Sequence, residues 1–434
     1  MRAVDIIVKK RDGGELTTAE IDMLIDGYTH DRVSDEQMAA WAMAVVLRGM
    51  SDRETADLTL AMARSGAQLD LHDVAPITVD KHSTGGIGDK TTLLLAPLVA
   101  AVGLPVAKMS GRALGFSGGT IDKLESIDGF HVEMSSDAFR SAVRDIGLVI
   151  AAQSIDLAPA DKRLYALRDM TGTVESIPLI AASVMSKKLA AGADCIVLDV
   201  KCGRGAFMQT LDEARLLAQT MVAIGRHAGR QVSAVISTME QPLGQAVGNA
   251  LEVREAIEAL RGHGSDDLID LCLTLGAELT VLAGKAADRA EGRDLLYAAL
   301  EDGSAWNIFC RFITNQGGDQ RVLDDVSTLP SAPVVLAIPA PRSGVVAAID
   351  GMVLGQTVNA LGGGRLQKGN TIDPSVGLMV EAKIGSHVET GQPLVFIHAA
   401  SMQDAEREKI AIQSAFVIGD QKVAAPPLIH EIVA

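Results

Sequence analysis

Apolar residues recur at helical spacing through the first 65 residues. One face in the i, i+3, i+4, i+7 order of a buried helix side consists of Ile21, Leu24, Ile25 and Tyr28. Three capping boxes, in which Ser or Thr stands three residues before Glu or Gln, predict three helix starts: Thr17 with Glu20, Ser34 with Gln37, and Ser51 with Glu54. Gly49 and Gly66 are suited to end helices. The pattern predicts a helical N-terminal region.

From about residue 75, short apolar runs alternate with amphipathic helices. Strands are predicted at residues 77–79, 104–107, 148–152, 195–200 and 231–236, and helices at 93–102, 211–227 and 246–261. This alternation predicts a mostly parallel central sheet. Two helical stretches, 161–169 and 179–190, interrupt it and are expected to pack against the N-terminal helices.

At 434 residues the chain can hold two or three domains. The predicted fold class is α/β with an all-α domain, in which a mostly parallel central sheet is joined by a C-terminal α+β domain. We expect the all-α domain to comprise residues 1–70 and 160–192, and the α/β domain residues 71–159 and 193–330. A segment spaced by prolines, 331–344, is predicted as a linker, and 345–434 as the C-terminal domain.

The most informative stretch is residues 81–92, Lys-His-Ser-Thr-Gly-Gly-Ile-Gly-Asp-Lys-Thr-Thr, between a predicted strand and a predicted helix. Its three glycines allow backbone N–H groups to approach an anion closely. Lys81 adds positive charge, and hydroxyl donors come from Ser83, Thr84 and Thr92. The order of residues matches neither a P-loop nor a dinucleotide fingerprint. A phosphate-binding βα loop is predicted, with a tight turn that binds nothing as the alternative.

A second glycine-rich turn, residues 110–125, follows the next predicted strand. Because the carboxyl ends of neighbouring parallel strands meet at one edge of a sheet, Ser110 and Thr120 could complete the same anion site. Lys81, Lys108 and Arg112 would gather positive charge there, in a chain whose formal net charge is −16. That overall charge argues against nucleic acid or an anionic membrane as a partner.

Other features of the sequence limit the cellular location and the partners that we expect for the protein. Its four cysteines include no C-x-x-C pair, which favours reduced thiols and a cytoplasmic location. The N-terminus has no apolar signal core, and the longest apolar runs are too short to span a bilayer. We therefore expect neither a membrane nor a nucleic-acid partner.

Two helical pairs offer further chemistry. Tyr165 and Arg168 stand at i, i+3, and Ser183 and Lys187 at i, i+4, so each pair shares a helix face. Taken singly, Arg168 could pair with Asp161 or Asp169, Lys187 could be solvated, and His82 could be a turn histidine. The side chains of Arg168 and Lys187 are not expected to contribute to the core.

Together these stretches resemble the thymidine and pyrimidine-nucleoside phosphorylases over essentially the whole chain. The most specific stretches are residues 81–89, 110–125, 165–169, 176–188 and 241–244. At the position of Lys108, the broad-specificity bacterial branch of the family commonly has Lys, whereas the thymidine-selective branch commonly has Met. In this respect the chain resembles the broad-specificity branch. The chain is therefore identified as a member of the pyrimidine-nucleoside branch.

The resemblance implies an activity and a set of roles. The activity is reversible phosphorolysis of uridine, thymidine and deoxyuridine to the free base and α-D-(deoxy)ribose 1-phosphate, a step of nucleoside salvage. Phosphate is the co-substrate, no redox cofactor is needed, and a homodimer is expected, formed by the all-α domain that binds the pyrimidine. The implied catalytic residues are His82, Arg168 and Lys187. The implied phosphate ligands are Lys81, Ser83, Thr92, Lys108, Ser110 and Thr120. The implied pyrimidine ligands are Leu114, Tyr165, Arg168, Ser183 and Lys187.

The chemistry suits these residue types. Phosphate attacks C1′ of the sugar while the pyrimidine leaves through N1, and the departing charge spreads to O2 and O4. Cations and donors aimed at those oxygens stabilise the transition state more than the ground state. His82 could also transfer a proton.

The family also has a monovalent-cation site, potassium in bacterial members, and it maps to Gly88, Lys90, Leu243, Ala246 and Glu255. Two alternatives follow for Lys90: its ammonium replaces the ion, or it points to solvent beside an intact ion site. Phe116 and Ser117 stand where the family usually has His-Thr, which removes hydrogen-bonding capacity beside the base.

Two other functions are weighed. An enzyme like anthranilate phosphoribosyltransferase would need an acidic pair that binds magnesium for pyrophosphate, whereas the Tyr165 to Lys187 pattern favours a neutral base. A catalytically silent regulator that binds nucleoside or phosphate need not keep the donors for the leaving group.

Overall fold

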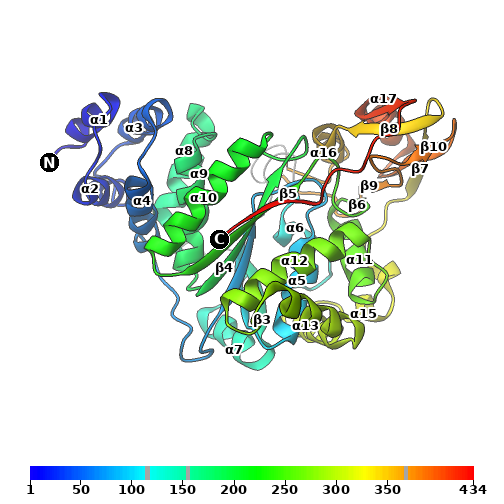
Figure 1. Ribbon diagram of the computed structural model, residues 1–434, viewed down its shortest axis with the longest axis horizontal. Helices are drawn as coiled ribbons and strands as arrows, with labels where there is room; N and C mark the ends of the chain where they lie inside the picture. Colours follow the sequence, from blue (N-terminus) through cyan, green and yellow to red (C-terminus); the bar gives the residue numbers. More distant parts are fainter. Residues whose placement is uncertain (113–117, 153–156, 366–369) are drawn as a thin grey trace.

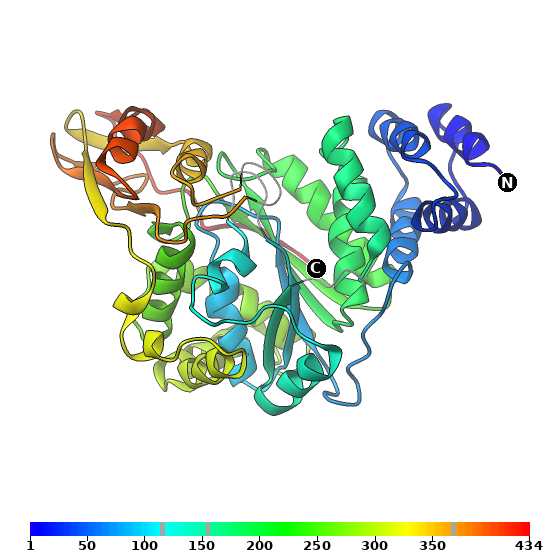
Figure 2. The same cartoon turned by 180° about the vertical axis from the view of Figure 1, so that it is seen from behind.

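The structure, a computed structural model, describes residues 1–112, 118–152, 157–365 and 370–434. A helical domain at one end of the molecule contains α1 (Ala3–Arg11), α2 (Thr18–Thr29), α3 (Asp35–Arg48) and α4 (Asp52–Arg64), as Figures 1 and 2 show from opposite sides. All three predicted capping boxes are formed, at the starts of α2, α3 and α4. Gly49 ends α3 with a positive φ of 69°, which glycine adopts at little cost.

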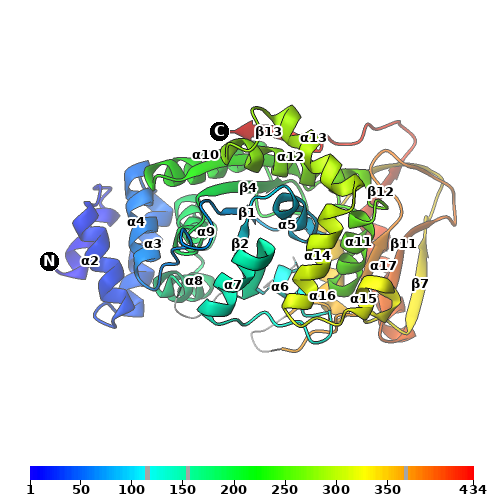
Figure 3. The same ribbon diagram turned by 90° about the horizontal axis from the view of Figure 1, so that it is seen from below.

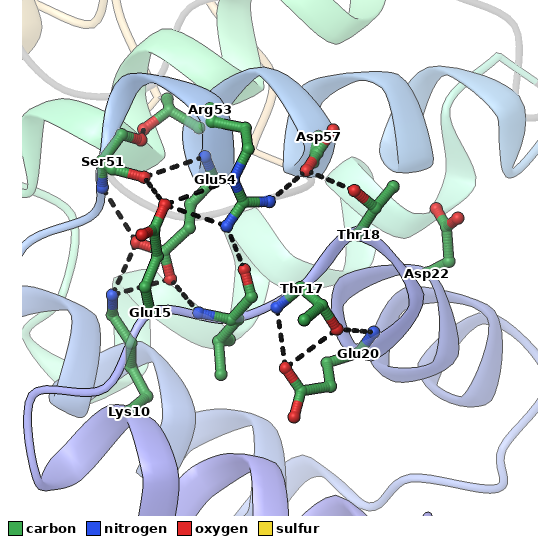
Figure 4. A network of polar contacts seen from close by, with 12 residues as sticks. Lys10, Glu15, Thr17, Thr18, Glu20, Asp22, Ser51, Arg53, Glu54 and Asp57 are labelled. Atoms are coloured by element: carbon green, nitrogen blue, oxygen red, sulfur yellow. Dashed lines mark hydrogen bonds and ion pairs between the residues drawn. The ribbon is translucent and has the colours of Figure 1, made fainter.

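A buried ion pair ties this domain together. Lys10 of α1 donates to both carboxylate oxygens of Glu54 on α4, at 2.9 and 2.8 Å, and both side chains are at most 5% exposed. Figure 4 shows the surrounding network, in which Glu54 also accepts from the backbone N–H of Leu16 and of Ser51. These bonds compensate for burying the two charges.

The interrupting helices pack against this domain as predicted. They are α8 (Pro159–Thr171) and α9 (Ile177–Ala190). Leu164 and Leu167 of α8 and Leu179 of α9 share one core with Tyr28 and Trp41 of the N-terminal helices. The helical domain is therefore built from two distant parts of the chain.

A six-stranded sheet lies beside it in the order β13-β5-β4-β1-β2-β3. Its parallel strands are β1 (Val79–Ser83), β2 (Val106–Ser110), β3 (Leu148–Ala152), β4 (Cys195–Cys202) and β5 (Gln231–Thr238). Figure 3 shows helices on both sides of the sheet. One face packs against α5 (Thr91–Ala101), α11 (Asn249–Leu260) and α12 (Asp266–Leu282); the other packs against α9 and α10 (Leu211–His227). The predicted mostly parallel α/β architecture is confirmed.

Further helices surround this domain. They are α6 (Thr120–Leu124), α7 (Ser136–Ile146), α13 (Arg289–Glu301), α14 (Ser304–Asn315), α15 (Arg321–Asp324) and a 3-10 turn at Val326–Thr328. None of the helices in the described ranges combines the length and the apolar character that a bilayer span requires.

The C-terminal domain lies at the end of the molecule opposite the N-terminal helices (Figure 1). Its strands are β7 (Val334–Pro339), β8 (Gly344–Ile349), β9 (Gly377–Val380), β10 (His387–Val388), β11 (Pro393–Ala399) and β12 (Phe416–Gly419). Its helices are α16 (Gly351–Ala360) and α17 (Met402–Ala415).

Three segments differ from the predicted domain division. The linker predicted at 331–344 contains β7, which pairs with β11, because its apolar residues complete a sheet and its prolines stand outside the strand or at its end. The last strand, β13 (Ile429–Val433), leaves the C-terminal domain and runs antiparallel to β5. A short strand, β6 (Ala246–Val247), replaces the start of the helix predicted at 246–261 and pairs with β9.

The two strands before the glycine-rich turns end later than predicted. They extend to Ser83 and Ser110, through polar residues that the apolar runs do not include. β1 lies between β2 and β4, so its backbone is paired on both sides. This position places charged side chains on interior strands.

Candidate active site

Strand β1 divides the site into two sides. Successive side chains of a strand point to opposite faces of the sheet. Lys81 therefore faces α5, where its Nζ donates to the Thr91 hydroxyl. Asp80 faces α9, where its Oδ2 lies 2.6 Å from Lys188 Nζ. His82 points to the same face as Asp80. The consecutive residues Lys81 and His82, near the end of β1, therefore point to opposite faces of the sheet.

The side of the sheet that faces α5, called the anion side below, is where the phosphate site is expected. Lys81, Thr92 and Lys108 line one small cavity of about 10 Å³ together with Asp80 and six apolar residues, whereas Ser83, Ser110 and Thr120 do not line it. Ser83 and Ser110 end the adjacent strands β1 and β2, and Thr120 is the first residue of α6. These elements gather the expected phosphate ligands at the carboxyl edge of the sheet.

Gly88 shows why the first turn needs glycine. Its φ is 73°, and a Cβ at this position would lie 2.7 Å from the Leu243 carbonyl oxygen and 3.0 Å from that of Ala246. Any other residue would therefore combine backbone strain with a clash against fixed backbone atoms. The turn is held tightly against the loop that precedes α11.

Lys108 lies between the two sides. Its Nζ donates to the Lys81 carbonyl oxygen and lies 3.3 Å from Asp80 Oδ1. Burial lowers the pKa of Lys108 to about 7, against the opposing effect of Asp80 and with the help of nearby Lys188 and Lys81. Arg112, the third cation of the predicted cluster, pairs instead with Glu125 and is 41% exposed. Only Lys81 and Lys108 of that cluster are enclosed together.

A larger cavity of about 160 Å³ opens on the other side. Its polar lining consists of His82, Thr84, Tyr165, Arg168 and Ser183. Its apolar lining consists of Val174, Ile180, Val184, Phe207, Met208 and Leu217. Apolar walls with a few convergent polar groups are typical of a small-molecule pocket. Of the residues predicted to hold a pyrimidine, Tyr165, Arg168 and Ser183 share this cavity, whereas Lys187 does not line it. Leu114, with Phe116 and Ser117, lies outside the described residues.

Lys187 joins this group through two contacts. Its Nζ lies 2.9 Å from Ser183 Oγ and 2.5 Å from Asp161 Oδ2. Asp161 is 5% exposed, and its ion pair with Lys187 links α8 to α9. This carboxylate holds the Lys187 ammonium beside Ser183.

Arg168 pairs with neither Asp161 nor Asp169, the two partners that its position in the sequence suggested. Its guanidinium is buried and donates to three backbone carbonyls: Thr173 at 3.1 Å, Val174 at 2.6 Å and Leu179 at 3.0 Å. Within the described ranges no carboxylate forms an ion pair with it. Burial lowers the pKa of Arg168 to about 10, with Asp161 opposing, so it stays charged at neutral pH. The expectation that Arg168 does not build the core is wrong, because its side chain organises the connection between α8 and α9.

His82 is partly buried in the cavity wall. Burial, followed by the positive charges of Lys188, Lys108, Lys187 and Lys81, lowers the pKa of His82 well below its usual value. The imidazole is therefore neutral near pH 7 and has one N–H to donate.

The side chain of Lys90 is fully enclosed. Its Nζ donates to the carbonyls of Leu243 at 2.8 Å and Ala246 at 2.9 Å, and to Glu255 Oε2 at 2.6 Å. The ammonium thus occupies the centre of the residues that resemble a cation site, and the alternative in which Lys90 points to solvent is wrong. Across the described segments no cluster of three or more His, Cys, Asp or Glu side chains is arranged to hold a metal ion.

Several charged residues around the site were not predicted from the sequence. They are Asp80, Lys188, Asp199 and Lys201, all buried, together with the pairing of Asp161 to Lys187. A signal was present at Asp199 and Lys201, because charged residues two apart in an otherwise apolar strand must share a buried face. Their partners could not be identified from spacing.

Comparisons with known proteins bear on the whole chain. An α/β domain model of a glycosyl transferase family matches residues 75–306, and the helical bundle domain of that family matches 4–66. The C-terminal domain of pyrimidine nucleoside phosphorylase matches residues 345–419.

Relatives of similar length match from end to end. The pyrimidine-nucleoside phosphorylase of Bacillus subtilis (strain 168) is 53% identical over 437 residues, and that of Staphylococcus aureus (strain N315) is 52% identical over 433 residues. Each alignment covers 100% of both chains. Among solved structures, anthranilate phosphoribosyltransferase from Thermus thermophilus aligns with a TM-score of 0.60 and 22% identity, over 73% of this chain and 99% of that one. This last likeness shows a shared fold alone.

Proposed function

Because the chain belongs to the pyrimidine-nucleoside phosphorylase family of pentosyltransferases, we propose that it converts uridine, thymidine and deoxyuridine reversibly to the free base and α-D-(deoxy)ribose 1-phosphate. One observation carries the proposal. A single strand, β1, presents Lys81 to the anion side and His82 to the cavity lined by Arg168 and Ser183. Phosphate and pyrimidine would therefore meet across the end of β1.

Phosphate would be held by Lys81, Ser83, Thr92, Lys108, Ser110 and Thr120. The positive-φ glycines of the first turn leave backbone N–H groups accessible, and the adjacent hydroxyls supply further donors. Holding phosphate and sugar in line converts the attack on C1′ into an intramolecular step. No redox chemistry takes part.

The pyrimidine would bind in the larger cavity. Arg168 has five N–H donors and gives three of them to backbone carbonyls, so two remain for the base oxygens. Lys187 has three donors and gives two to Asp161 and Ser183, so one remains. These cations would stabilise negative charge on O2 and O4 as the C1′–N1 bond breaks.

His82 would act as a neutral donor. Because its pKa is lowered well below the usual value, the imidazole keeps one N–H near pH 7 and carries no charge. It would donate that N–H to the departing pyrimidine and so add to the stabilisation by the two cations.

Ligands on two domains imply closure. The phosphate ligands lie on the α/β domain, whereas Tyr165, Arg168, Ser183 and Lys187 lie on α8 and α9 of the helical domain. Bringing both substrates into line would require the two domains to close over them, which also excludes water.

The same helical domain would form a homodimer. Large apolar side chains are exposed on α1 and α3, which pack against each other: Val4 and Val8 on the first, and Met43, Val46 and Leu47 on the second, with Leu47 73% exposed. Exposed apolar clusters of this kind mark association surfaces. Val8→Lys combined with Leu47→Lys should yield monomers, measured by light scattering after gel filtration, whereas an unchanged mass would exclude this face.

Base release from uridine tests the activity. Uracil and ribose 1-phosphate should appear together and only with phosphate, and arsenate should support uracil release in its place. Lys187→Ala supplies a matched control for contaminating enzymes, because it should retain little activity. Uracil release that continues unchanged without either anion would show hydrolysis. Binding of uridine without any release would indicate a silent regulator.

A further inference from the structure

A second lysine is buried beneath the anion side. Lys201 and Asp199 both lie on β4 and are fully buried. The pairing of β1 with β4 sets Lys81 opposite Val197, so Lys81, Asp199 and Lys201 point to the same face of the sheet. Three charged side chains thus occupy the interior directly under the first glycine-rich turn.

One carboxylate oxygen is shared between the two lysines. Asp199 Oδ2 lies 2.8 Å from Lys201 Nζ and 3.4 Å from Lys81 Nζ. The other oxygen, Oδ1, accepts a hydrogen bond from the Ser237 hydroxyl at 2.6 Å, and Lys201 also reaches that hydroxyl at 3.1 Å. Lys201 is therefore the closer cation for Asp199.

Lys81 faces a second carboxylate as well. Asp89 Oδ1 lies 3.7 Å from Lys81 Nζ, within the glycine-rich turn. Burial alone would raise the pKa of Asp89, but Lys81, Lys201 and Lys123 hold it well below its usual value. Asp199 and Asp89 likewise raise the pKa of Lys201 against the effect of burial. Asp89 and Lys201 are therefore both charged at neutral pH.

This arrangement poses an electrostatic problem for phosphate. A dianion that approaches Lys81 meets two carboxylates around one ammonium, and interactions between charges are strong in a buried site. Without Lys201 the group would carry a net negative charge, and both carboxylates would compete for Lys81. With Lys201 the two carboxylates are balanced by two ammonium groups.

We propose that Lys201 is a positioning residue for phosphate binding: it neutralises Asp199 and so leaves the Lys81 ammonium for the incoming anion. The inference rests on the proposed phosphate site. Lys201 acts through Lys81 and is not a catalytic residue. Its backbone N–H separately donates to the Thr84 hydroxyl at 2.9 Å, a contact that a side-chain substitution keeps.

Lys201→Met tests the role, because methionine keeps much of the length and removes the charge. The KM for phosphate should rise at least about tenfold, since Asp199 then captures Lys81, while the KM for uridine changes by less than about twofold. Adding Asp199→Asn removes the competing carboxylate. The double variant should bring the phosphate KM back to within about threefold of the starting enzyme, as coupled neighbours do in a mutant cycle.

Lys10→Met is the matched control. Lys10 is also a buried lysine, and it is paired with Glu54 in the helical domain. Its loss should lower the melting temperature and leave the phosphate KM unchanged. Phosphate affinity is also measured without turnover, from the rise in melting temperature with added phosphate, so a protein that binds phosphate but does not cleave uridine is recognised as a failure of the proposed function instead.

Several outcomes would overturn the inference. Equal rises in the phosphate and uridine KM of Lys201→Met would indicate a structural role, and so would a double variant that restores nothing. If Lys201→Met does not fold, Asp199→Asn decides: it should leave the phosphate KM unchanged or lower, and a rise above about threefold contradicts the proposed competition.

Discussion

Replacing Lys90 by threonine removes an ammonium that the fold has enclosed. The side chain is 0% exposed, and Nζ donates to two carbonyls and to Glu255. Removing one member of a buried ion pair typically costs about 3–5 kcal/mol. Glu255 keeps three other donors, the backbone N–H groups of Gln245 and Ala246 at 2.8 Å and the Ser265 hydroxyl at 3.1 Å. We therefore expect a loss near the lower limit, about 3 kcal/mol.

A potassium ion should recover most of that loss. The vacated position keeps two carbonyl oxygens and one carboxylate, all suitable ligands for a hard cation, and the N···O distances of 2.6–2.9 Å suit potassium better than the smaller sodium ion. Binding that is specific to the folded state stabilises by about 2.7 kcal/mol when the ion is at 100 times its Kd. Lys90→Thr should therefore become dependent on potassium.

The assay compares melting temperature and kcat in equal concentrations of potassium and sodium chloride. The starting protein should respond equally to both salts, and Lys90→Thr should be more stable and more active in potassium. Lys285→Thr, which removes an exposed lysine, controls for the loss of one charge. A starting protein whose melting temperature rises with potassium but not with sodium would refute the reasoning, because the ion site would then be open.

The remaining predictions concern the two sides of the site. Lys187→Ala should lower kcat/KM for uridine by about 10²–10³, the scale for losing a preorganised charged donor, and should also lower the melting temperature, because Asp161, 5% exposed, loses its ammonium partner. Arg168→Ala should lower kcat/KM at least as much and also lower the melting temperature, since three buried carbonyls lose their donor; full activity in either variant would exclude that residue from stabilising the leaving group. Lys108→Met should weaken catalysis on ribosides by roughly 1.5–3 kcal/mol if the lysine donates to the 2′-hydroxyl, and an unchanged ratio of uridine to thymidine kcat/KM would show that it does not. In the unmodified protein the ratio of uridine to deoxyuridine kcat/KM should fall as the pH rises through about 7, because Lys108 then loses its charge and donates less strongly; Lys108→Met should show no such fall. The free energy of unfolding should change in the other direction and rise with pH. Burying the charged form of Lys108 destabilises the folded protein at and below about pH 7. This cost is relieved between about pH 7 and 10.5, because only the unfolded chain holds the proton there. Chemical denaturation across that range, compared with Lys108→Met, checks it.

Much of the local structure followed from short-range patterns. The capping boxes at Thr17, Ser34 and Ser51 form as predicted, and the helix predicted at 211–227 has those bounds. A capping box places both partners within three residues, and an amphipathic face needs only a regular spacing. These features depend on neighbours along the chain, so the sequence determines them.

For the candidate site, the sequence indicated which residues lie together more reliably than it indicated their contacts. Tyr165, Arg168 and Ser183 do line one cavity with His82. The spacing of Arg168 nevertheless suggested carboxylate partners, and the structure gives it backbone carbonyls. A spacing identifies the face of a helix, but the loop that folds over that face selects the partner.

Only the tertiary structure decided which partners the buried charged side chains have. Lys90 and Glu255 are 165 residues apart in sequence, Lys188 and Asp80 are 108 apart, and Ser237 and Asp199 are 38 apart. The last strand, β13, pairs with β5 across an even longer separation and leaves the domain that precedes it. Periodicity specifies which side of an element a residue faces. Strand order, register and helix packing decide which charged side chains meet, because they set the distances between elements. They also decide whether water is excluded from the space between those elements.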